Sequence, residues 1–344
     1  MRWLLVHPGP EFSVHDVYTG WTEALRRLGV QVAEFNLNDR LKFYDWALLE
    51  TGEDDGDGHP QVKKAFTRPE AVNLAVQGVL SLAYTYWPDV VFLVSAFFTN
   101  PGYLDIMRSR GHKIVLLHTE SPYQDQKQLK IAEHADLNLV NDPATLGAYK
   151  ALGPAEYMPH AYRPQIHHPG RCQPELKSDF CFAGTGWQSR VEFFEAMDLD
   201  GIDVALAGTW PGIEDSPLGK YLAHDPELAA GNEQVAAMYR SSKAGINFYR
   251  REGDEGQAPG WAMGPREVEM AATGLFFLRD PRGEGDGVFP MLPTFSSPGD
   301  ASERLRWWLA HDEQRNVAAR QAREAIEDRT FDNNARRLLK LLDR

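Results

Sequence analysis

A short stretch that combines glycines with charged side chains, residues 261–280, has the makings of an anion site. Gly264-Pro265 suits a tight turn followed by the first turn of a helix, and Gly274 suits the end of that helix. The apolar run 275–278 then predicts a buried strand. Free main-chain N–H groups and the helix dipole would face an anion at the helix start. Three charged side chains crowd this start, namely Arg266, Glu267 and Glu269.

A second loop of interest is Gly184-Thr185-Gly186, which lies between a predicted strand and a predicted helix. It lacks the third glycine of the dinucleotide fingerprint, and no Walker pattern occurs in the chain. Taken alone, the loop indicates only that the backbone approaches something closely. An anionic ligand and a neighbouring segment of chain are equally compatible with it.

Polar side chains at the ends of predicted strands are candidates for the chemistry itself. His118 ends an apolar strand, and its imidazole could donate to a sugar hydroxyl or to developing negative charge. His15 and Asp16 lie in the first loop, just before a predicted helix, where an acceptor hydroxyl could need a base. Capping of that helix by Asp16 is an equally good interpretation of the pair.

The sequence gives no strong metal signature. Two Asp-x-Asp triplets occur, Asp55-Gly56-Asp57 and Asp198-Leu199-Asp200, but neither follows a strand, so we expect solvated carboxylates. His167-His168 has no cysteine or acid cluster after it, which favours a solvated linker over a metal pair. We therefore predict no metal site.

Strands and helices that position these residues alternate along the chain, which predicts an α/β fold of doubly wound, Rossmann-like domains. In such sheets, ligands bind beyond the carboxyl ends of the strands. The acidic, glycine-rich stretch 50–60 predicts a mobile surface loop. Predicted strands lie at 3–6, 30–35, 89–94, 113–117, 137–140, 156–158, 179–183, 204–207, 244–248 and 275–278. Predicted helices lie at 19–28, 69–86, 101–110, 124–134, 144–152, 190–197, 234–241, 266–272, 301–310, 312–328 and 332–342.

Bulk properties exclude several classes of protein. A chain of 344 residues fits two domains of about 150 residues each. No apolar run approaches about 18 residues, so we expect no membrane span. The net charge of −13 disfavours duplex DNA as a partner. Without an export signal, Cys172 and Cys181 are expected to be reduced thiols in a cytoplasmic protein.

The second half of the chain resembles the nucleotide-binding domain of GT-B glycosyltransferases, in particular the glycosyltransferase group 1 type and its CgeB-like relatives. In the segment 182–190, the strand-end Gly184 is followed six residues later by Arg190. The family has Gly-Arg at this strand end and a lysine six positions after the glycine, and both cations hold the donor diphosphate. Arg190 matches that lysine, whereas Thr185 replaces the arginine.

The second matching motif lies in residues 261–280. The group 1 pattern has a glutamate, a glycine three residues on, and then Glu-Ala-Met-Ala-x-Gly, of which Gly264 and the segment 269–274 match the last two parts. The resemblance gives Glu269 the ribose hydroxyls to bind, for which a carboxylate is well suited. Arg266 resembles the basic residue that CgeB-like sequences place before this helix, and its fork suits a diphosphate. Trp261 replaces the first glutamate, which contacts the donor sugar in the family.

The resemblance implies a GT-B arrangement of two Rossmann-like domains facing across a cleft. It assigns residues 1–165 to an acceptor domain, 166–177 to a linker, 178–331 to the nucleotide-sugar domain, and 332–343 to a helix that crosses back. His118 resembles the strand-end histidine near the donor sugar, and His15 and Asp16 are the candidate bases. The residues expected to bind the donor are Gly184, Thr185, Gly186, Arg190, Gly264, Arg266, Glu267 and Glu269.

The implied activity is metal-independent transfer of a sugar from a nucleoside diphosphate-sugar, linked to UDP or GDP, without a further cofactor. The acceptor stays open, with a protein, a glycan or a small molecule favoured over duplex DNA. Two alternatives remain. One is a nucleotide-sugar epimerase on the same fold, and the other is a catalytically inactive nucleotide-sugar-binding protein, which Trp261 favours.

Overall fold

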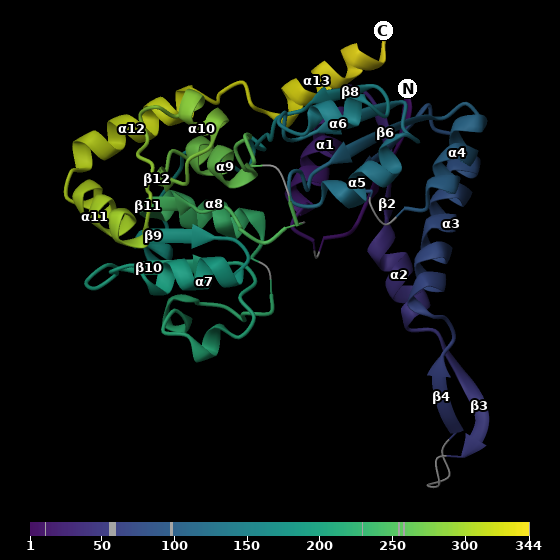
Figure 1. The fold of residues 1–344 in the computed structure, drawn as a ribbon, viewed down its shortest axis with the longest axis horizontal. Helices are drawn as coiled ribbons and strands as arrows, with labels where there is room; N and C mark the ends of the chain where they lie inside the picture. Colours follow the sequence, from purple (N-terminus) through teal and green to yellow (C-terminus); the bar gives the residue numbers. More distant parts are fainter. Residues whose placement is uncertain are drawn as a thin grey trace. The chain divides into compact units, whose positions relative to one another are not determined.

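The computed structural model describes residues 1–10, 12–54, 60–96, 99–228, 230–253, 255–256 and 259–343. The chain divides into two compact units, unit 1 at Met1–Met158 and unit 2 at Pro159–Arg344. Each unit combines helices with a parallel sheet, which confirms the predicted α/β class (Figure 1). Within the described ranges, no helix is both long and apolar enough to cross a membrane. The triplet Asp55-Gly56-Asp57 lies outside the described residues.

Unit 1 is built on a parallel sheet with the strand order β2-β1-β5-β6-β7-β8. Alternate residues of its strands pack on opposite faces. Leu4 and Val6 join the core beneath α3 and α4, whereas Trp3 packs edge-on against Phe92 on the other face. Its elements are β1 (Arg2–His7), α1 (His15–Arg27), β2 (Gln31–Asn36), α2 (Leu37–Asp45), β3 (Leu48–Asp54), β4 (Pro60–Lys64), α3 (Arg68–Tyr86), β5 (Val90–Val94), α4 (Pro101–Ser109), β6 (Lys113–His118), α5 (Asp125–Ala132), β7 (Leu137–Val140), α6 (Leu146–Lys150) and β8 (Ala155–Tyr157).

Unit 1 also carries a feature that the sequence pattern did not predict. A mobile loop was expected over residues 50–60, but residues 50–54 and residue 60 belong to strands β3 and β4, which pair as an antiparallel hairpin, and residues 55–59 lie outside the described residues. Figure 1 shows this hairpin projecting beyond the ends of α2 and α3, away from the sheet. Glu50 pairs with Val62 in the ladder, so strand pairing outweighs the low strand propensity of the glycine and acidic residues.

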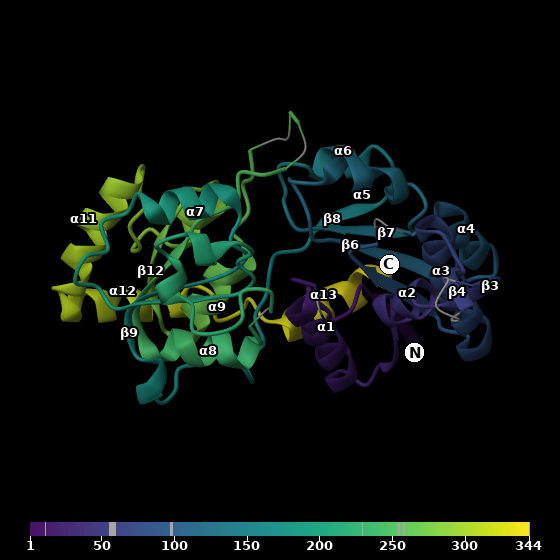
Figure 2. The same ribbon diagram turned by 90° about the horizontal axis from the view of Figure 1, so that it is seen from below.

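Unit 2 is built on a parallel sheet with the order β10-β9-β11-β12. Helices α7 and α8 lie on opposite faces of this sheet, as Figure 2 shows. Its elements are β9 (Ser178–Ala183), α7 (Gln188–Glu195), β10 (Val204–Ala207), α8 (Asn232–Ser241), β11 (Ser242–Asn247), α9 (Pro265–Thr273), β12 (Phe276–Arg279), α10 (Gly283–Val288), α11 (Pro298–Leu309), α12 (Asp312–Glu324) and α13 (Phe331–Leu342). Its strands are lined by a continuous apolar core that includes Phe180, Phe182 and Phe277.

The order of strands in unit 2 reverses between β9 and β11, because the chain moves from β9 to β10 on one side and then crosses to β11 on the other. In open α/β sheets, the loops at such a switch point form the ligand crevice at the carboxyl ends of the strands. Here they are the loop after β9, which begins at Gly184, and the loop after β11, which begins at Phe248. The strand order therefore places the glycine loop, residues 184–186, at the position where such sheets bind ligands.

The segment predicted as a linker, residues 166–177, packs on α8 and α9 of unit 2. Arg240 of α8 donates to the carbonyl of Ile166 at 3.0 Å, and the N–H of Gln173 donates to Ser241 Oγ at 3.0 Å. His168 is exposed, but His167 is only 2% exposed, so the prediction of a solvated histidine pair is wrong for His167.

Candidate functional site

The loop after β9 is held tightly by the neighbouring strand end. The N–H of Gly184 donates to the carbonyl of Ala207 at 2.9 Å, and that of Gly186 donates to Thr209 at 2.8 Å. Gly184 has a φ of +156°, and a Cβ there would collide with the guanidinium of Arg266. A Cβ on Gly186 would collide with the fully buried ring of Trp210. Both glycines are therefore explained by close packing within unit 2.

Two arginines meet at this loop, although they lie far apart in the sequence. The guanidinium carbons of Arg190 and Arg266 lie 5.3 Å and 4.7 Å from the centre of the Phe182 ring. A ring at such distances stabilises the positive charge of each group. Arg190 comes from α7, whereas Arg266 comes from the first turn of α9, so the fold concentrates cations at the carboxyl end of β9.

The two arginines differ in how they are held. Arg190 is 6% exposed, and it donates to the carbonyls of Phe248 at 3.1 Å and Thr185 at 2.8 Å. It thereby ties the two switch-point loops together. Arg266 donates to the carbonyl of Ala183 and to Asn247 Oδ1 at 2.9 Å, but it is only half-buried. Arg266 is therefore the better placed of the two to contact a ligand.

The start of α9 rests on a buried carboxylate. Glu267 is 0% exposed, and its Oε2 accepts the N–H of Gly264 at 2.9 Å and the hydroxyl of Tyr249. Its Oε1 has no hydrogen-bond partner among the described residues. Burial raises the pKa of Glu267 to about 7, against the opposing effect of these two donors. Glu267 therefore shapes the helix start from beneath, and its role as a donor ligand stays a prediction.

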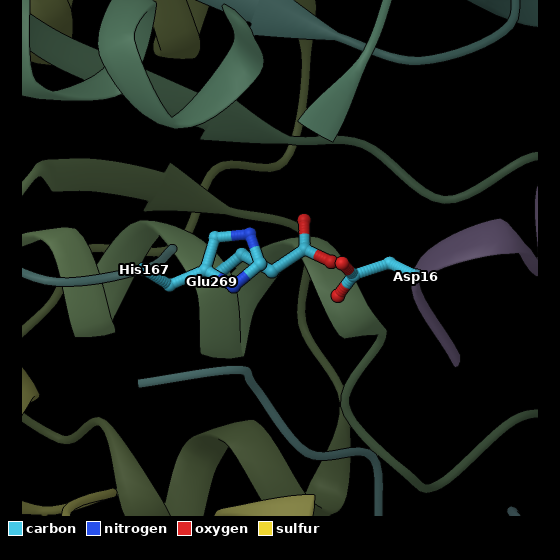
Figure 3. A group of neighbouring side chains, drawn as sticks. All are labelled: Asp16, His167 and Glu269. Atoms are coloured by element: carbon cyan, nitrogen blue, oxygen red, sulfur yellow. The ribbon is translucent and has the colours of Figure 1, made fainter. Parts of the chain in front are cut away.

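Glu269, two residues on, is half-buried rather than fully buried. Figure 3 shows its side chain beside the imidazole of His167, and their ligand atoms lie within 4.8 Å of each other. The figure also labels Asp16, which belongs to unit 1. His167 was not among the predicted site residues, because the pair His167-His168 was interpreted as part of a solvated linker.

A further acidic residue that the sequence did not reveal holds the start of α7. The carboxylate of Glu252 accepts the N–H of Ser189 at 3.0 Å and its hydroxyl at 3.0 Å, and the N–H of Arg251 at 3.0 Å. A carboxylate is well placed at a helix N-terminus because it meets free N–H groups and the positive end of the dipole. Trp261, at the position of the family's first glutamate, is 43% exposed.

In unit 1, His118 is buried in a polar network at the end of β6. The amide nitrogen of Asn138 donates to the carbonyls of Ala132 at 2.9 Å and Pro154 at 3.3 Å, so its Oδ1 must face His118 Nε2, at 2.8 Å. His118 therefore donates from Nε2, and burial lowers its pKa to about 4. The imidazole is 1% exposed and neutral at pH 7, and its contact with a sugar stays a prediction.

The pair His15 and Asp16 lies inside α1, which starts earlier than predicted. The N-cap of α1 is Val14, so the alternative interpretation of Asp16 as the helix cap is wrong, although a carboxylate in the first turn still complements the dipole. His15 is exposed and stacks on Tyr18, which stacks in turn on His7 at 3.8 Å between ring centres. A role for His15 or Asp16 as a base stays a prediction.

Comparison with known proteins found one family model and several solved structures that resemble this chain. Residues 188–340 match a family model described as glycosyl transferase-like. The chain has no significant match among curated proteins. It is similar in structure to sucrose-phosphate synthase from Thermosynechococcus elongatus, with 13% identity, a TM-score of 0.67, and coverage of 99% of this chain and 98% of the other.

Two more solved structures share this fold. One, from E. coli, is described as trehalose-6-phosphate bound with UDP-2-fluoro glucose, with 12% identity, a TM-score of 0.65 and 99% coverage of both chains. The other, from Listeria monocytogenes, is described as a UDP-N-acetylglucosamine 2-epimerase, with 11% identity, a TM-score of 0.60, and coverage of 99% of this chain and 95% of the other. Residues 188–340 thus match a glycosyl transferase-like family model, and the likeness to these solved structures confirms the predicted GT-B fold.

Proposed function

We propose that unit 2 binds a nucleoside diphosphate-sugar, and that the enzyme transfers the sugar to an acceptor without a divalent metal. The observation that carries the proposal is the meeting of Arg190 and Arg266 at the carboxyl end of β9. Both arginines come from elements of the glycosyl transferase-like domain. Two fixed positive charges at a sheet switch point suit a diphosphate, because guanidinium groups bind phosphate oxygens through paired N–H donors.

The chemistry needs a stable leaving group. When the bond between the anomeric carbon and the diphosphate oxygen breaks, that oxygen takes the electron pair and gains negative charge. Arg266 and the main-chain N–H groups at the start of α9 would stabilise this charge electrostatically, in the role that a metal plays elsewhere. The acceptor's nucleophilic atom bonds to the anomeric carbon, and its proton passes to a base. His15 and Asp16 are the proposed bases, and His118 is the proposed sugar contact.

We propose UDP as the first nucleotide to test, because the similar E. coli structure is described with UDP-2-fluoro glucose. The resemblance of Arg266, in the first turn of α9, to the basic residue that CgeB-like sequences place before this helix supports that narrower relationship. Glu269 would accept the ribose hydroxyls. Cys172 and Cys181 are both free thiols, which fits the proposed cytoplasmic setting.

One other function has a specific observation in its favour. Trp261 occupies the position of the family's sugar-contacting glutamate, which suits a protein that binds the nucleotide-sugar without transferring it. Donor binding with neither transfer to any acceptor nor hydrolysis would support this second function. Conversion of the donor alone into an isomer would instead indicate an epimerase.

The test is titration calorimetry of the full chain with UDP and GDP in the presence of EDTA. We expect micromolar-class binding of one nucleotide, on the order of a Kd of 1–100 μM. Arg266→Gln removes a charged donor to phosphate and should weaken that binding by about 10- to 100-fold.

Arg304→Gln is the matched control. Arg304 is an exposed arginine on α11 that pairs with Asp300, so it should leave nucleotide binding unchanged. If neither nucleotide binds, or if binding appears only when a divalent ion is supplied, the proposal of a metal-independent nucleotide-sugar enzyme is wrong.

A further inference from the structure

The turn that carries His167 is built into unit 2 rather than left in solvent. The N–H groups of Ile166 and His167 both donate to the carbonyl of Arg163, at 3.0 Å and 2.8 Å. Arg240 holds the carbonyl of Ile166 from α8. A Cβ on Gly274, at the end of α9, would lie 3.6 Å from Pro169 Cγ, so the segment after the turn packs against that helix end. The turn that carries His167 is therefore fixed relative to α8 and the end of α9.

The hydrogen bonding of this imidazole determines which nitrogen carries the proton. The main-chain N–H of Arg163 donates to His167 Nδ1 at 3.3 Å. A nitrogen that accepts a hydrogen bond carries no proton, so the ring is neutral and its proton is on Nε2. His167 thus presents a single N–H donor on the side of the ring away from its own turn.

We propose that His167 is a positioning residue for Glu269, with its Nε2–H oriented toward the Glu269 carboxylate. The ligand atoms of the two side chains lie within 4.8 Å, and Figure 3 shows the side chains next to each other. A donor at that range reaches a carboxylate directly after a small side-chain rotation, or through one bridging water. Such a donor favours the ionised carboxylate and limits its rotation.

This inference rests on the proposed function and deepens it, because it names a further residue that determines how the ribose is recognised. An ionised carboxylate can accept both hydroxyls of a vicinal diol only when its two oxygens face them. Glu269 is half-buried on α9, one helical turn beyond Pro265, so its orientation depends on its neighbours. His167 would supply that orientation without touching the nucleotide.

The experiment measures the preference of the full chain for UDP over 2′-deoxy-UDP, or for the corresponding GDP pair if GDP is the nucleotide bound. We expect the wild type to prefer the ribonucleotide by about tenfold, the value of one hydrogen bond to a charged group. His167→Leu should reduce this ratio to about twofold or less. His167→Gln should retain most of it, because the Gln side-chain amide places an N–H donor near the position of Nε2.

His168→Leu is the matched control, because His168 is the exposed neighbour of His167 and should leave the ratio unchanged. Glu269→Gln should lower the ratio as His167→Leu does, and the double variant should lower it no further. A ratio that survives in His167→Leu, with binding otherwise intact, would overturn the positioning role and leave the proposed function standing. A wild type that binds no nucleotide would overturn both.

Discussion

In unit 2, the burial of the Glu267 carboxyl group opposes its ionisation. Its carboxyl group is 0% exposed, its Oε1 lacks a partner among the described residues, and its pKa is raised from 4.5 to about 7. An acid with a raised pKa binds its proton more tightly in the folded state than in the unfolded chain. Its contribution to stability is therefore fully present below pH 4.5 and is lost as the pH rises through about 7.

Glu267→Gln should remove this pH dependence, because the amide of glutamine does not ionise and still offers an oxygen to Gly264 and Tyr249. Between pH 4.5 and 7, the wild type should lose up to about 3 kcal/mol of unfolding free energy relative to the variant, at about 1.4 kcal/mol per pKa unit. Urea unfolding across this pH range provides the measurement. Two curves that run parallel would show that Glu267 does not titrate in this window.

At the scale of single residues, the sequence was informative where a motif fixes the role of a position. The motif gives Arg266 a role in binding the donor diphosphate, which stays a prediction, and the structure places its side chain against Ala183 and the space next to Gly184. Helical spacing also held a signal for Glu267, because it lies three and four residues before the buried Met270 and Ala271. Nothing local predicted the burial of His167, because its segment packs on α8 and the end of α9, which lie far away in the sequence.

At the scale of elements, α5, α6 and the end of β6 are joined by one polar network. Asp125 Oδ1 accepts the hydroxyl of Tyr149 at 2.7 Å and also the hydroxyl of Ser121. Gln128 Nε2 donates to the oxygen of Tyr149 at 3.1 Å. The ring of Tyr149 lies 4.6 Å from that of His118, between ring centres. The network therefore fixes both the loop after β6 and the histidine that precedes it.

Tyr149→Phe keeps the ring that packs on His118 but removes the donor to Asp125. Loss of a hydrogen bond to a charged group should lower the free energy of unfolding by about 1.5–3 kcal/mol, as measured by urea denaturation. Tyr84→Phe, at a side chain that is 40% exposed, is the control and should change it by less than about 0.5 kcal/mol. Equal effects of the two substitutions would show that the network carries no stability.

The sequence predicted the elements of the two sheets well, because buried parallel strands appear as continuous apolar runs with few alternatives. Strands β7 and β10 have the bounds predicted for them, and the other predicted strands differ at their ends. The hairpin β3–β4 and helix α2 were missed for a physical reason. Leu37–Asp45 has only one buried residue, Leu37, and the hairpin pairs only with itself, so neither has the apolar pattern that burial imposes.

At the scale of the whole molecule, the net charge of the chain does not reveal the local group of positive charges in unit 2. The chain has a net charge of −13, yet two arginines are concentrated at one strand end of unit 2. Average composition argued against duplex DNA but gave no information on a local cationic centre, which arises only when the fold places Arg190 of α7 and Arg266 of α9 against the Phe182 ring of β9. The residues proposed to bind the nucleoside diphosphate part of the donor, from Gly184 to Glu269, all belong to unit 2.

The location of these residues predicts which backbone amides of the intact chain exchange more slowly with deuterium when UDP is bound, or GDP if that is the nucleotide bound. A ligand at about 100 times its Kd stabilises the state that binds it by about 2.7 kcal/mol, so amides that exchange by opening of the site should slow by up to about 100-fold. Peptides covering residues 184–190 and 264–269 should show this protection. Peptides covering residues 118–125 of unit 1 should not, because the nucleotide contacts proposed here involve no residue of that unit. Protection confined to unit 1 would show that the nucleotide does not bind to unit 2, and it would contradict the roles proposed for Arg266 and Glu269.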